Sequence, residues 1–362
     1  MAHKGERLVL KVGTSVLTQP TQQLDYNVIH QIVEQVGALR RAGPQVVLVT
    51  SGAAGASYGL GDFGREKNSL LRKQLMTAVG QPRLMSVYTA FFREHHITVA
   101  QALLTRSDFG DRERYLNVRN VMEGLLRAGV LPILNENDVV TTEALTFGDN
   151  DYLAAAAASL TGAERLFLLT TGEGFYSAGD PRHHPEARLI PEVTQITPQM
   201  WDWCQGSLSS GGTGGMLSKL KAAEMATSFG IEAHIVSGKA PGVVPRVMAG
   251  EALGTRFVPT GRRVKSYRQW LRFGALTSGR ITVDEGAARA LRNDKSLLPA
   301  GIARVEGIFN SGDVVEIYTA AGEKLGDGLI AFSAQELAAM REAGQRPARS
   351  VEAIHKDRLL LV

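Results

Sequence analysis

Residues 209–219 form a glycine-rich stretch, Ser209-Ser210-Gly211-Gly212-Thr213-Gly214-Gly215-Met216-Leu217-Ser218-Lys219, and a helix-like run from Leu220 to Phe229 follows it. Glycines at four of the five positions 211–215 let the backbone turn its amides onto an anion. The helix adds the positive end of its dipole, and Lys219 adds a mobile cation. The pattern predicts a phosphate site, although a surface turn before an ordinary helix would show a similar pattern.

The composition indicates a globular protein with more than one domain. At 362 residues, with 44% hydrophobic and 21% charged residues, the chain has the size expected for two domains. The single cysteine, Cys204, excludes an intrachain disulfide and a cysteine metal cluster. The sequence has neither a signal-peptide pattern nor an apolar run of roughly 20 residues. We therefore expect a cytoplasmic protein that does not enter a membrane.

Apolar strand-like runs alternate with amphipathic helical runs through the first two thirds of the chain. The strand-like runs are 8–12, 46–49, 97–104, 130–134, 166–169 and 233–236, and the helical runs between them include 28–39, 70–94, 112–127 and an alanine-rich run to about 160. This alternation predicts an α/β fold with an open, mainly parallel sheet sandwiched by helices. In such sheets ligands bind beyond the carboxyl ends of the strands. Four polar residues fall at or just after predicted strand ends: Lys11, Ser51, Asp138 and Thr170.

The character of the sequence changes after about residue 255. Residues 256–272 carry six basic residues and no acidic one, which is typical of a linker, and two short β-like runs, 279–283 and 312–318, then flank a helical run at 285–292. We predict three segments: a catalytic domain at 1–255, a basic linker at 256–275 and a small β-rich domain at 276–355. Residues 1–255 hold 23 Lys and Arg against 24 Asp and Glu, whereas residues 256–362 hold 17 against 12.

A polar cluster, Gly148-Asp149-Asn150-Asp151, opens the alanine-rich helix. A helix cap needs only one Asp or Asn, so capping does not account for all three polar side chains. Lys11 lies within an apolar strand, and a buried ammonium needs an anion or a carboxylate beside it. Asp151 could hold both Lys11 and Lys219 by charge, while Asn150 could hydrogen-bond a small ligand. Each residue alone is more often structural, but their common placement at strand ends favours a site.

The residue types at this edge favour phosphoryl transfer. Asp138 and Ser51 are short polar groups suited to an ammonium or a carboxylate. The chain has no Gly-x-x-x-x-Gly-Lys-Ser/Thr loop and no Gly-x-Ser-x-Gly turn, which argues against a P-loop nucleotide site and a serine hydrolase. Two lysines and a glycine cradle without a protein nucleophile fit transfer of a phosphoryl group to a substrate carboxylate, which needs no general base.

Several motifs resemble the bacterial glutamate 5-kinase family, which has the amino acid kinase fold. They are Lys11-Val-Gly-Thr-Ser15, Ser51-Gly-Ala, Leu104-Thr-Arg-Ser-Asp108, Asp111-Arg-Glu-Arg-Tyr-Leu-Asn117, Asn135-Glu-Asn-Asp138, Gly148-Asp-Asn-Asp151 and Thr213-Gly-Gly-Met-Leu-Ser-Lys219, in family order across about residues 8–255. The C-terminal part, with Gly279-Arg-Ile-Thr-Val-Asp-Glu-Gly286, Leu298-Pro-Ala-Gly301-Ile302 and Gly312-Asp313-Val314, is similar to a PUA domain.

The resemblance implies ATP-dependent phosphorylation of the side-chain carboxylate of L-glutamate, which gives L-glutamyl 5-phosphate in the first step of proline biosynthesis. It implies that two lysines stabilise the transferring phosphoryl group and an aspartate orients them: Lys11, Lys219 and Asp151. It implies three glutamate-binding residues: Ser51, Asp138 and Asn150. It implies an ATP site formed by Lys11, Thr170, Thr171, Thr213, Gly214, Gly215, Met216, Leu217, Ser218 and Lys219.

The resemblance also implies ligands and an assembly. Family members use ATP with Mg2+, which the ATP phosphates rather than protein ligands would mainly hold. They are usually inhibited by proline and are usually homo-oligomers, so we expect proline as an inhibitor and a dimer or tetramer.

The sequence departs from the family pattern at two positions and leaves two other functions open. The family usually has Thr-Asp where this chain has Thr170-Thr171, which affects the expected nucleotide contact, and Gly179 is an added residue. One alternative is a related kinase that phosphorylates another acid, such as N-acetylglutamate. The other is an RNA-binding or regulatory protein that acts through the PUA-like domain, although the only aromatic residues after 275 are Phe309, Tyr318 and Phe332.

Overall fold

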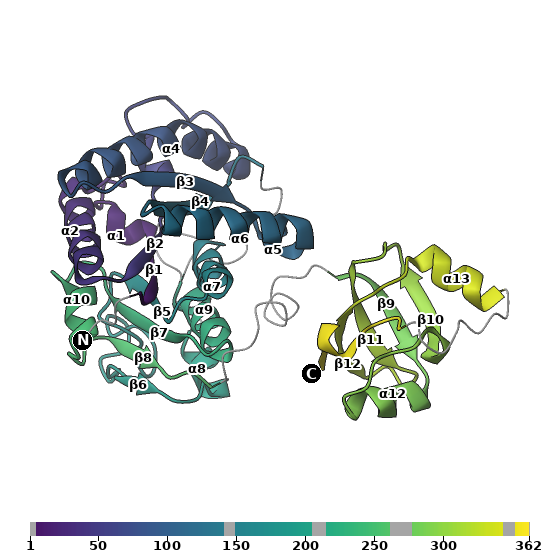
Figure 1. Ribbon diagram of the computed structural model, residues 1–362. Helices are drawn as coiled ribbons and strands as arrows, with labels where there is room; N and C mark the ends of the chain where they lie inside the picture. The colour runs from purple at the N-terminus through teal and green to yellow at the C-terminus, as the bar shows by residue number, and fades with distance from the viewer. Residues whose placement is uncertain (1–4, 141–148, 205–214, 261–276, 343–351, 362) are drawn as a thin grey trace. The chain divides into compact units, whose positions relative to one another are not determined.

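The computed structural model describes residues 5–140, 149–204, 215–260, 277–342 and 352–361. The chain forms two compact units (Figure 1). The first comprises Met1–Arg106 and Asn117–Arg263, and the second comprises Ser107–Leu116 and Val264–Val362. Each unit has its own sheet and its own hydrophobic core, and each is described by itself below.

The first unit is built on an eight-stranded sheet with the spatial order β3-β4-β2-β1-β5-β7-β8-β6. The strands are β1 (Arg7–Val12), β2 (Gln45–Val49), β3 (Val99–Leu104), β4 (Leu131–Glu136), β5 (Arg165–Thr170), β6 (Glu192–Val193), β7 (Glu232–Ser237) and β8 (Thr255–Phe257). The six strands from β3 to β7 in this order run parallel, whereas β8 is antiparallel to β7 and parallel to β6. The predicted open, mainly parallel sheet is confirmed.

Helices cover both faces of this sheet (Figure 1). Up to residue 260 the described helices are α1 (Thr14–Leu17), α2 (Tyr26–Ala42), α3 (Ala53–Ala56), α4 (Ser69–Glu94), α5 (Arg106–Gly110), α6 (Arg112–Arg127), α7 (Asp149–Thr161), α8 (Pro198–Trp203), α9 (Met216–Ser228) and α10 (Val243–Met248). Helices α2, α4 and α10 share one core with Leu8, Leu10 and Val12 of β1, whose side chains alternate along the strand. On the other face, α7 packs against β1 and α9, and α9 packs against β7.

Local sequence explains where these elements begin and end. Helix α2 begins after Asp25, whose carboxylate accepts hydrogen bonds from the backbone N–H groups of Asn27 and Val28, and it ends at Gly43, which has a φ of 116°. Five consecutive buried alanines, Ala154 to Ala158, make α7 narrow enough to approach both β1 and α9 closely. This close approach brings the first turn of α7 to the carboxyl ends of the strands.

The region predicted as a linker begins with residues that belong to the first sheet. Arg256 and Phe257 lie in β8, where Arg256 pairs with Glu192 at 2.9 Å and with Glu232 at 2.6 Å. The basic side chain therefore belongs to an edge strand with acidic neighbours on β6 and β7, a pairing that charge composition alone does not indicate. Residues 261–275 of the predicted linker lie outside the described residues, and the predicted domain bounds stay predictions.

The second unit contains a five-stranded sheet with the order β10-β9-β11-β12-β13. Its elements are β9 (Thr277–Val283), α12 (Glu285–Arg292), the 3-10 turn η1 (Pro299–Gly301), β10 (Ile302–Gly307), β11 (Val314–Thr319), β12 (Lys324–Leu329), α13 (Ala334–Glu342), the 3-10 turn η2 (Lys356–Arg358) and β13 (Leu359–Leu361). Strands β9 and β11 are parallel and the other pairs antiparallel. Apolar side chains from the sheet, α12 and α13 form its core. The predicted small β-rich C-terminal domain is confirmed.

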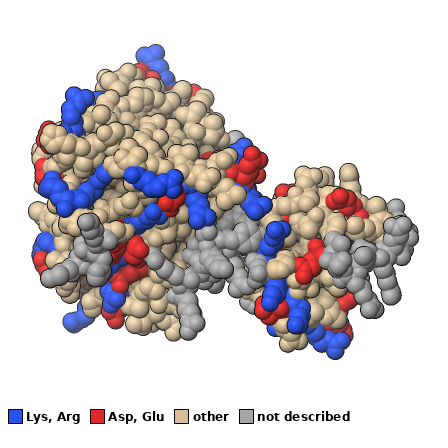
Figure 2. Space-filling view, viewed as in Figure 1, with Lys and Arg blue, Asp and Glu red and all other residues tan. Residues whose placement is uncertain are grey.

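Several basic side chains in the described part of the second unit are paired locally. Ion pairs join Arg292 to Glu323 at 2.9 Å, and Lys324 to Glu316 and Asp327 at 3.0 and 2.8 Å. Figure 2 accordingly shows Lys and Arg side chains of this unit beside Asp and Glu on the visible face. Across both units, the described helices include none long and apolar enough to span a bilayer.

Candidate active site

A buried carboxylate holds two lysines at the carboxyl edge of the first sheet. Asp151 is fully buried in the first turn of α7, and its Oδ1 lies 2.6 Å from Nζ of Lys11, while its Oδ2 lies 3.3 Å from Nζ of Lys219. The hydroxyl of Ser218 also donates a hydrogen bond of 2.5 Å to Oδ2. Both lysine side chains are about as buried as the carboxylate, at 5% and 6% exposure. One carboxylate and two ammonium groups leave a net positive charge here.

Three different elements deliver these side chains. Lys11 is the penultimate residue of central strand β1, and Lys219 lies in the first turn of α9, which begins directly after Gly215. The Gly13 backbone then turns away from β1, and a Cβ at Gly13 would lie 3.6 Å from Nζ of Lys11. A glycine here therefore leaves space beside the lysine ammonium. The site thus combines two cations with the N-terminal end of α9, an arrangement suited to phosphate.

Electrostatics keep the Asp151 carboxylate ionised. Burial alone would raise the pKa of Asp151, but the charges of Lys11 and Lys219 and the Ser218 hydrogen bond outweigh it, so that the pKa is well below its usual range. Burial lowers the pKa of Lys11, and the nearby Lys219 charge lowers it further, while the charge of Asp151 opposes both effects. Asp151 is therefore the group that keeps Lys11 charged in a buried position.

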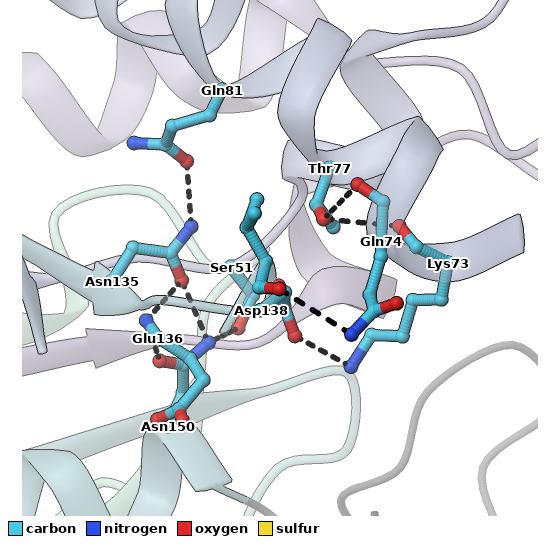
Figure 3. Close-up of polar contacts among 10 residues, drawn as sticks. Ser51, Lys73, Gln74, Thr77, Gln81, Asn135, Glu136, Asp138 and Asn150 are labelled. Carbon is cyan, nitrogen blue, oxygen red and sulfur yellow. Dashed lines mark hydrogen bonds and ion pairs between the residues drawn. The ribbon is translucent and has the colours of Figure 1, made fainter. Parts of the chain in front are cut away.

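A second polar cluster joins α7 to the ends of β2 and β4 (Figure 3). The Asn150 side-chain amide donates to Oγ of Ser51 at 3.0 Å and to Oδ1 of Asn135 at 2.9 Å, and its Oδ1 accepts from the backbone N–H of Glu136 at 3.1 Å. Asn135 in turn donates to Oε1 of Gln81 on α4 at 2.8 Å. Because Ser51 accepts from Asn150, its own hydroxyl proton can be donated to a ligand oxygen.

An ion pair lies next to this cluster. Nζ of Lys73 on α4 lies 2.9 Å from Oδ1 of Asp138, which follows the end of β4 (Figure 3). The neighbouring Gln74 donates a long hydrogen bond of 3.4 Å from its side-chain amide to the carbonyl oxygen of Val139. Two consecutive residues of α4 thus contact two consecutive residues after β4. Asp138 is 11% exposed and Lys73 31% exposed, so the pair is open to small molecules.

The residues predicted to bind ATP lie at the ends of β5 and in the first turn of α9. Thr170 is the last residue of β5 and is half-buried, and the exposed Thr171 follows it. Gly215, Met216, Leu217, Ser218 and Lys219 form the start of α9. Thr213 and Gly214 lie outside the described residues. The catalytic and binding roles predicted for all of these residues stay predictions.

The structure brings together most of the predicted site residues and adds three more. Lys11, Asp151, Lys219 and Ser218 form one cluster, and Ser51 and Asn150 form another, which is joined to the first through the chain from Asn150 to Asp151. Asp138 contacts neither Ser51 nor Asn150 through a described hydrogen bond. Sequence reasoning gave no role to the residues that support these clusters: Lys73, Gln81 and Asn135. Lys73, Thr77 and Gln81 recur every four residues on α4, and such a polar stripe on a helix that packs against the core could have indicated them.

Comparison with known proteins identifies both parts of the chain. Residues 6–237 match the amino acid kinase family, and residues 279–353 match the PUA domain. The chain is 42% identical to the glutamate 5-kinase of Deinococcus radiodurans, over 98% of this chain and 100% of that protein. It is 40% identical to the glutamate 5-kinase of Dehalococcoides mccartyi and 41% identical to that of Moorella thermoacetica, over 99% of this chain and 98% and 97% of those proteins.

These similarities extend over nearly the whole chain, so they include both the kinase and the PUA region. The parallel sheet and the separate β-rich unit agree with them. The chain belongs to the glutamate 5-kinases, a group within the amino acid kinase family, and carries a PUA domain after the kinase domain.

Proposed function

We propose that the protein transfers the terminal phosphoryl group of ATP to the side-chain carboxylate of L-glutamate, giving ADP and L-glutamyl 5-phosphate. This is the first step of proline biosynthesis. The observation that supports it most directly is the fully buried Asp151, which holds the Lys11 and Lys219 ammonium groups at 2.6 and 3.3 Å. A neutral ligand would not compensate the net positive charge of this site. A phosphoryl group that moves between two oxygens does compensate it, and it needs fixed positive charge throughout the transfer.

The chain's own groups stabilise charge and do not have to move a proton. A bond forms between a glutamate side-chain oxygen and the terminal phosphorus, and the bond from that phosphorus to the bridging oxygen of ADP breaks. The attacking carboxylate is already ionised at neutral pH, so no general base is required. Lys11 and Lys219 would stabilise the negative charge on the transferring group and on the leaving oxygen. Asp151 would keep both ammonium groups charged and in position.

The second cluster would bind the substrate. The Ser51 hydroxyl accepts from Asn150 and can donate its proton to a carboxylate oxygen of glutamate. The Asn150 amide is held by Ser51, Asn135 and the Glu136 backbone, so its position is fixed before substrate enters. The Asp138 carboxylate would attract the substrate ammonium. Asn150 precedes Asp151 on α7, so one helical turn places substrate binding beside phosphoryl transfer.

The nucleotide would lie between the end of β5 and the start of α9. Thr170, Thr171 and residues 213–219 would contact ATP, with the first N–H groups of α9 directed at its phosphates. Mg2+ would be held mainly by the phosphates and water, as is usual for this ion on nucleotides. When bound, it would neutralise phosphate charge that the two lysines leave uncompensated.

Trapping of the product tests this function. Purified protein with ATP and Mg2+ is supplied with L-glutamate, N-acetylglutamate or L-aspartate, and hydroxylamine converts any acyl phosphate into a coloured hydroxamate. We expect ADP and hydroxamate in equal amounts with L-glutamate only. Hydroxamate formed with N-acetylglutamate and not with glutamate would support phosphorylation of a carboxylate but refute glutamate as the substrate.

A matched pair of lysine variants on α9 tests the role of the buried cation. Lys219→Ala should lower kcat by about 10²–10³-fold, the loss typical for one transition-state contact. Lys221→Ala removes an exposed lysine two residues further along the same helix and should leave kcat within about twofold. Equal losses in both variants would refute a specific role for Lys219.

Feedback, assembly and location form a separate part of the proposal. We propose that proline competes with glutamate, that the chain forms a dimer or tetramer, and that it acts in the cytoplasm. Proline should raise the KM for glutamate without changing the KM for ATP. Light scattering should give a mass of two or four chains of 39.0 kDa. A monomer, or inhibition competitive with ATP, would refute the corresponding statement.

A further inference from the structure

The ion pair between Lys73 and Asp138 is not used by the phosphoryl chemistry. Asp138 has a predicted substrate role, but Lys73 has none. Its Nζ lies 2.9 Å from Oδ1 of Asp138, beside the cluster that contains Ser51 and Asn150 (Figure 3). A lysine this close to Asp138 either holds the Asp138 carboxylate in place for the substrate or binds the substrate itself.

Hydrogen bonds near the start of α4 determine the backbone position of Lys73. The helix begins after Asn68, whose side chain accepts hydrogen bonds from the backbone N–H groups of Leu70 and Leu71. Thr77, one turn after Lys73, donates its hydroxyl to the Lys73 carbonyl oxygen at 3.0 Å. Lys73 therefore lies in the capped first part of the helix, where side-chain hydrogen bonds of Asn68 and Thr77 define the path of the backbone.

The charges of this pair are complementary to those of a free α-amino acid. An α-amino acid carries an ammonium and a carboxylate on the same carbon atom, so the two charges lie close together. The Asp138 carboxylate can accept from an ammonium, and the Lys73 ammonium has three protons, so that it can contact Asp138 and a second carboxylate together. At 11% and 31% exposure both groups can exchange water for a ligand.

We propose that Lys73 binds the α-carboxylate of the substrate while Asp138 binds its α-ammonium. This inference rests on the proposed function, because it assigns the two charged groups at the α-carbon of glutamate to two residues of the same site. Lys73 is thereby a specificity-determining residue: it selects a substrate that carries both charges.

The paired charges explain how the site would reject near relatives of glutamate. An acid whose amine is acetylated keeps the α-carboxylate that Lys73 attracts but loses the cation, so Asp138 has no ammonium partner and repels the negative charge of the ligand. An amine without the α-carboxylate keeps the cation that Asp138 attracts, but Lys73 has no carboxylate partner and repels that cation. Only the zwitterion meets an opposite charge at both positions, so the pair discriminates by repulsion as well as by attraction.

Three ligands separate direct binding from simple support of Asp138. L-Glutamate carries both α-groups, glutarate lacks the ammonium, and 4-aminobutyrate lacks the α-carboxylate. If Lys73 contacts the α-carboxylate, its removal weakens the binding of glutamate and glutarate but does not weaken the binding of 4-aminobutyrate. If Lys73 only holds Asp138, its removal weakens the binding of glutamate and 4-aminobutyrate, which carry the ammonium, and leaves the binding of glutarate unchanged.

The test measures these ligands against Lys73→Met and a control variant. KM and kcat are measured for glutamate, and inhibition constants against glutamate are measured for the two analogues. In Lys73→Met we expect KM for glutamate and the inhibition constant for glutarate to rise by roughly 10- to 50-fold, the loss of one partly exposed charge-assisted contact. The inhibition constant for 4-aminobutyrate should stay unchanged or fall, because Lys73 repels its ammonium, while kcat and the KM for ATP should stay within about twofold. Arg72→Met removes the exposed neighbouring cation of α4 and should change none of them.

Other results overturn the proposal. If Lys73→Met loses affinity for glutamate and 4-aminobutyrate but not for glutarate, Lys73 only supports Asp138. An equal loss of affinity for all three ligands indicates a general disturbance of the site. Lys73→Arg, which keeps the charge, should retain most of the affinity, and failure to do so also contradicts the proposal. If wild-type protein does not phosphorylate glutamate, the proposed function fails, and calorimetric binding of the same ligands to wild type and Lys73→Met still decides the role of Lys73.

Discussion

Replacing Asp151 with asparagine would remove the one charge that balances two buried lysines. The substitution keeps the size of the side chain and leaves an oxygen that can accept the Ser218 hydrogen bond. It changes the charge of the cluster from one net positive charge to two, at a position with no solvent exposure. The predicted consequence is a loss of both stability and activity, with opposite dependences on pH.

The size of the stability loss follows from burial of the pair. Removing one partner of a buried ion pair typically costs about 3–5 kcal/mol, because the remaining charge is left without compensation. The lysines can escape part of that cost by losing a proton. The pKa of Lys11 is already lowered by burial, and the Asp151 charge that opposes this would be gone, so that its pKa should fall further in Asp151→Asn.

The sign of the pH effects can be worked out from this shift. A lysine whose pKa in the folded protein lies below its unfolded value binds fewer protons when folded. The free energy of unfolding of Asp151→Asn should therefore increase as pH rises toward the unfolded lysine value of about 10.4. Activity should change in the opposite direction, because a neutral Lys11 no longer stabilises phosphate charge, and kcat should fall as pH rises.

Two assays on the same variant check these opposite trends. Urea unfolding at pH 6 to 9 gives the free energy of unfolding, and hydroxamate formation over the same range gives kcat, which we expect to be about 10²–10³-fold below wild type near neutrality. The double variant Lys11→Met/Asp151→Asn removes one of the unpaired charges and should be more stable than Asp151→Asn. A double variant whose losses simply add would refute the explanation by uncompensated charge.

Three further substitutions, the first with a control variant, test other parts of the fold and site. Gly80→Ala would place a Cβ 1.8 Å from a backbone oxygen of α3 and should cost about 1–3 kcal/mol in thermal unfolding, whereas Gly124→Ala, with nothing within 4 Å, should be neutral or stabilising. The pKa of Glu232 is lowered to about 2, mainly by a hydrogen bond from His234. Wild type should therefore lose stability as pH falls from about 4.5 toward 2, whereas Glu232→Gln should lack this loss in acid titration. Thr171→Asp should raise the preference for ATP over GTP in KM measurements, because a carboxylate accepts from the adenine amino group and repels the guanine carbonyl.

The sequence was sufficient to predict most of the sheet of the first unit because strands β1, β2, β4, β5 and β7 are buried along nearly their whole length. Such strands are continuous apolar runs, and Lys11 within one of them needed a carboxylate partner, for which Asp151 in the polar cluster that opens the alanine-rich helix was the candidate. The short strand β8 was not predicted, since it spans Thr255–Phe257 and its Arg256 is paired with acidic residues distant in sequence. Strands β10, β12 and β13 of the second unit were also missed, because each owes its place to a neighbouring strand more than to a local pattern.

The part of the site that sequence reasoning missed lies on α4, and the reason is tertiary. A strand end is visible in the sequence, so residues that follow strands can be grouped without a structure. Lys73 and Gln81 lie within a long helix, and only the packing of that helix shows that they reach Asp138 and Asn135. Gly80, whose absent side chain permits the close approach of α4 to α3, precedes Gln81 on the same helix.

Two independent supports therefore meet at the first turn of α7. The groups that we propose for phosphoryl transfer, Lys11, Asp151 and Lys219, lie on β1, α7 and α9. The groups that we propose for substrate selection are held from α4, through Lys73 and Gln81. If this division is correct, changes on α4 should alter the KM for glutamate and leave the KM for ATP unchanged, whereas changes around Asp151 should lower kcat for every acid that the enzyme accepts.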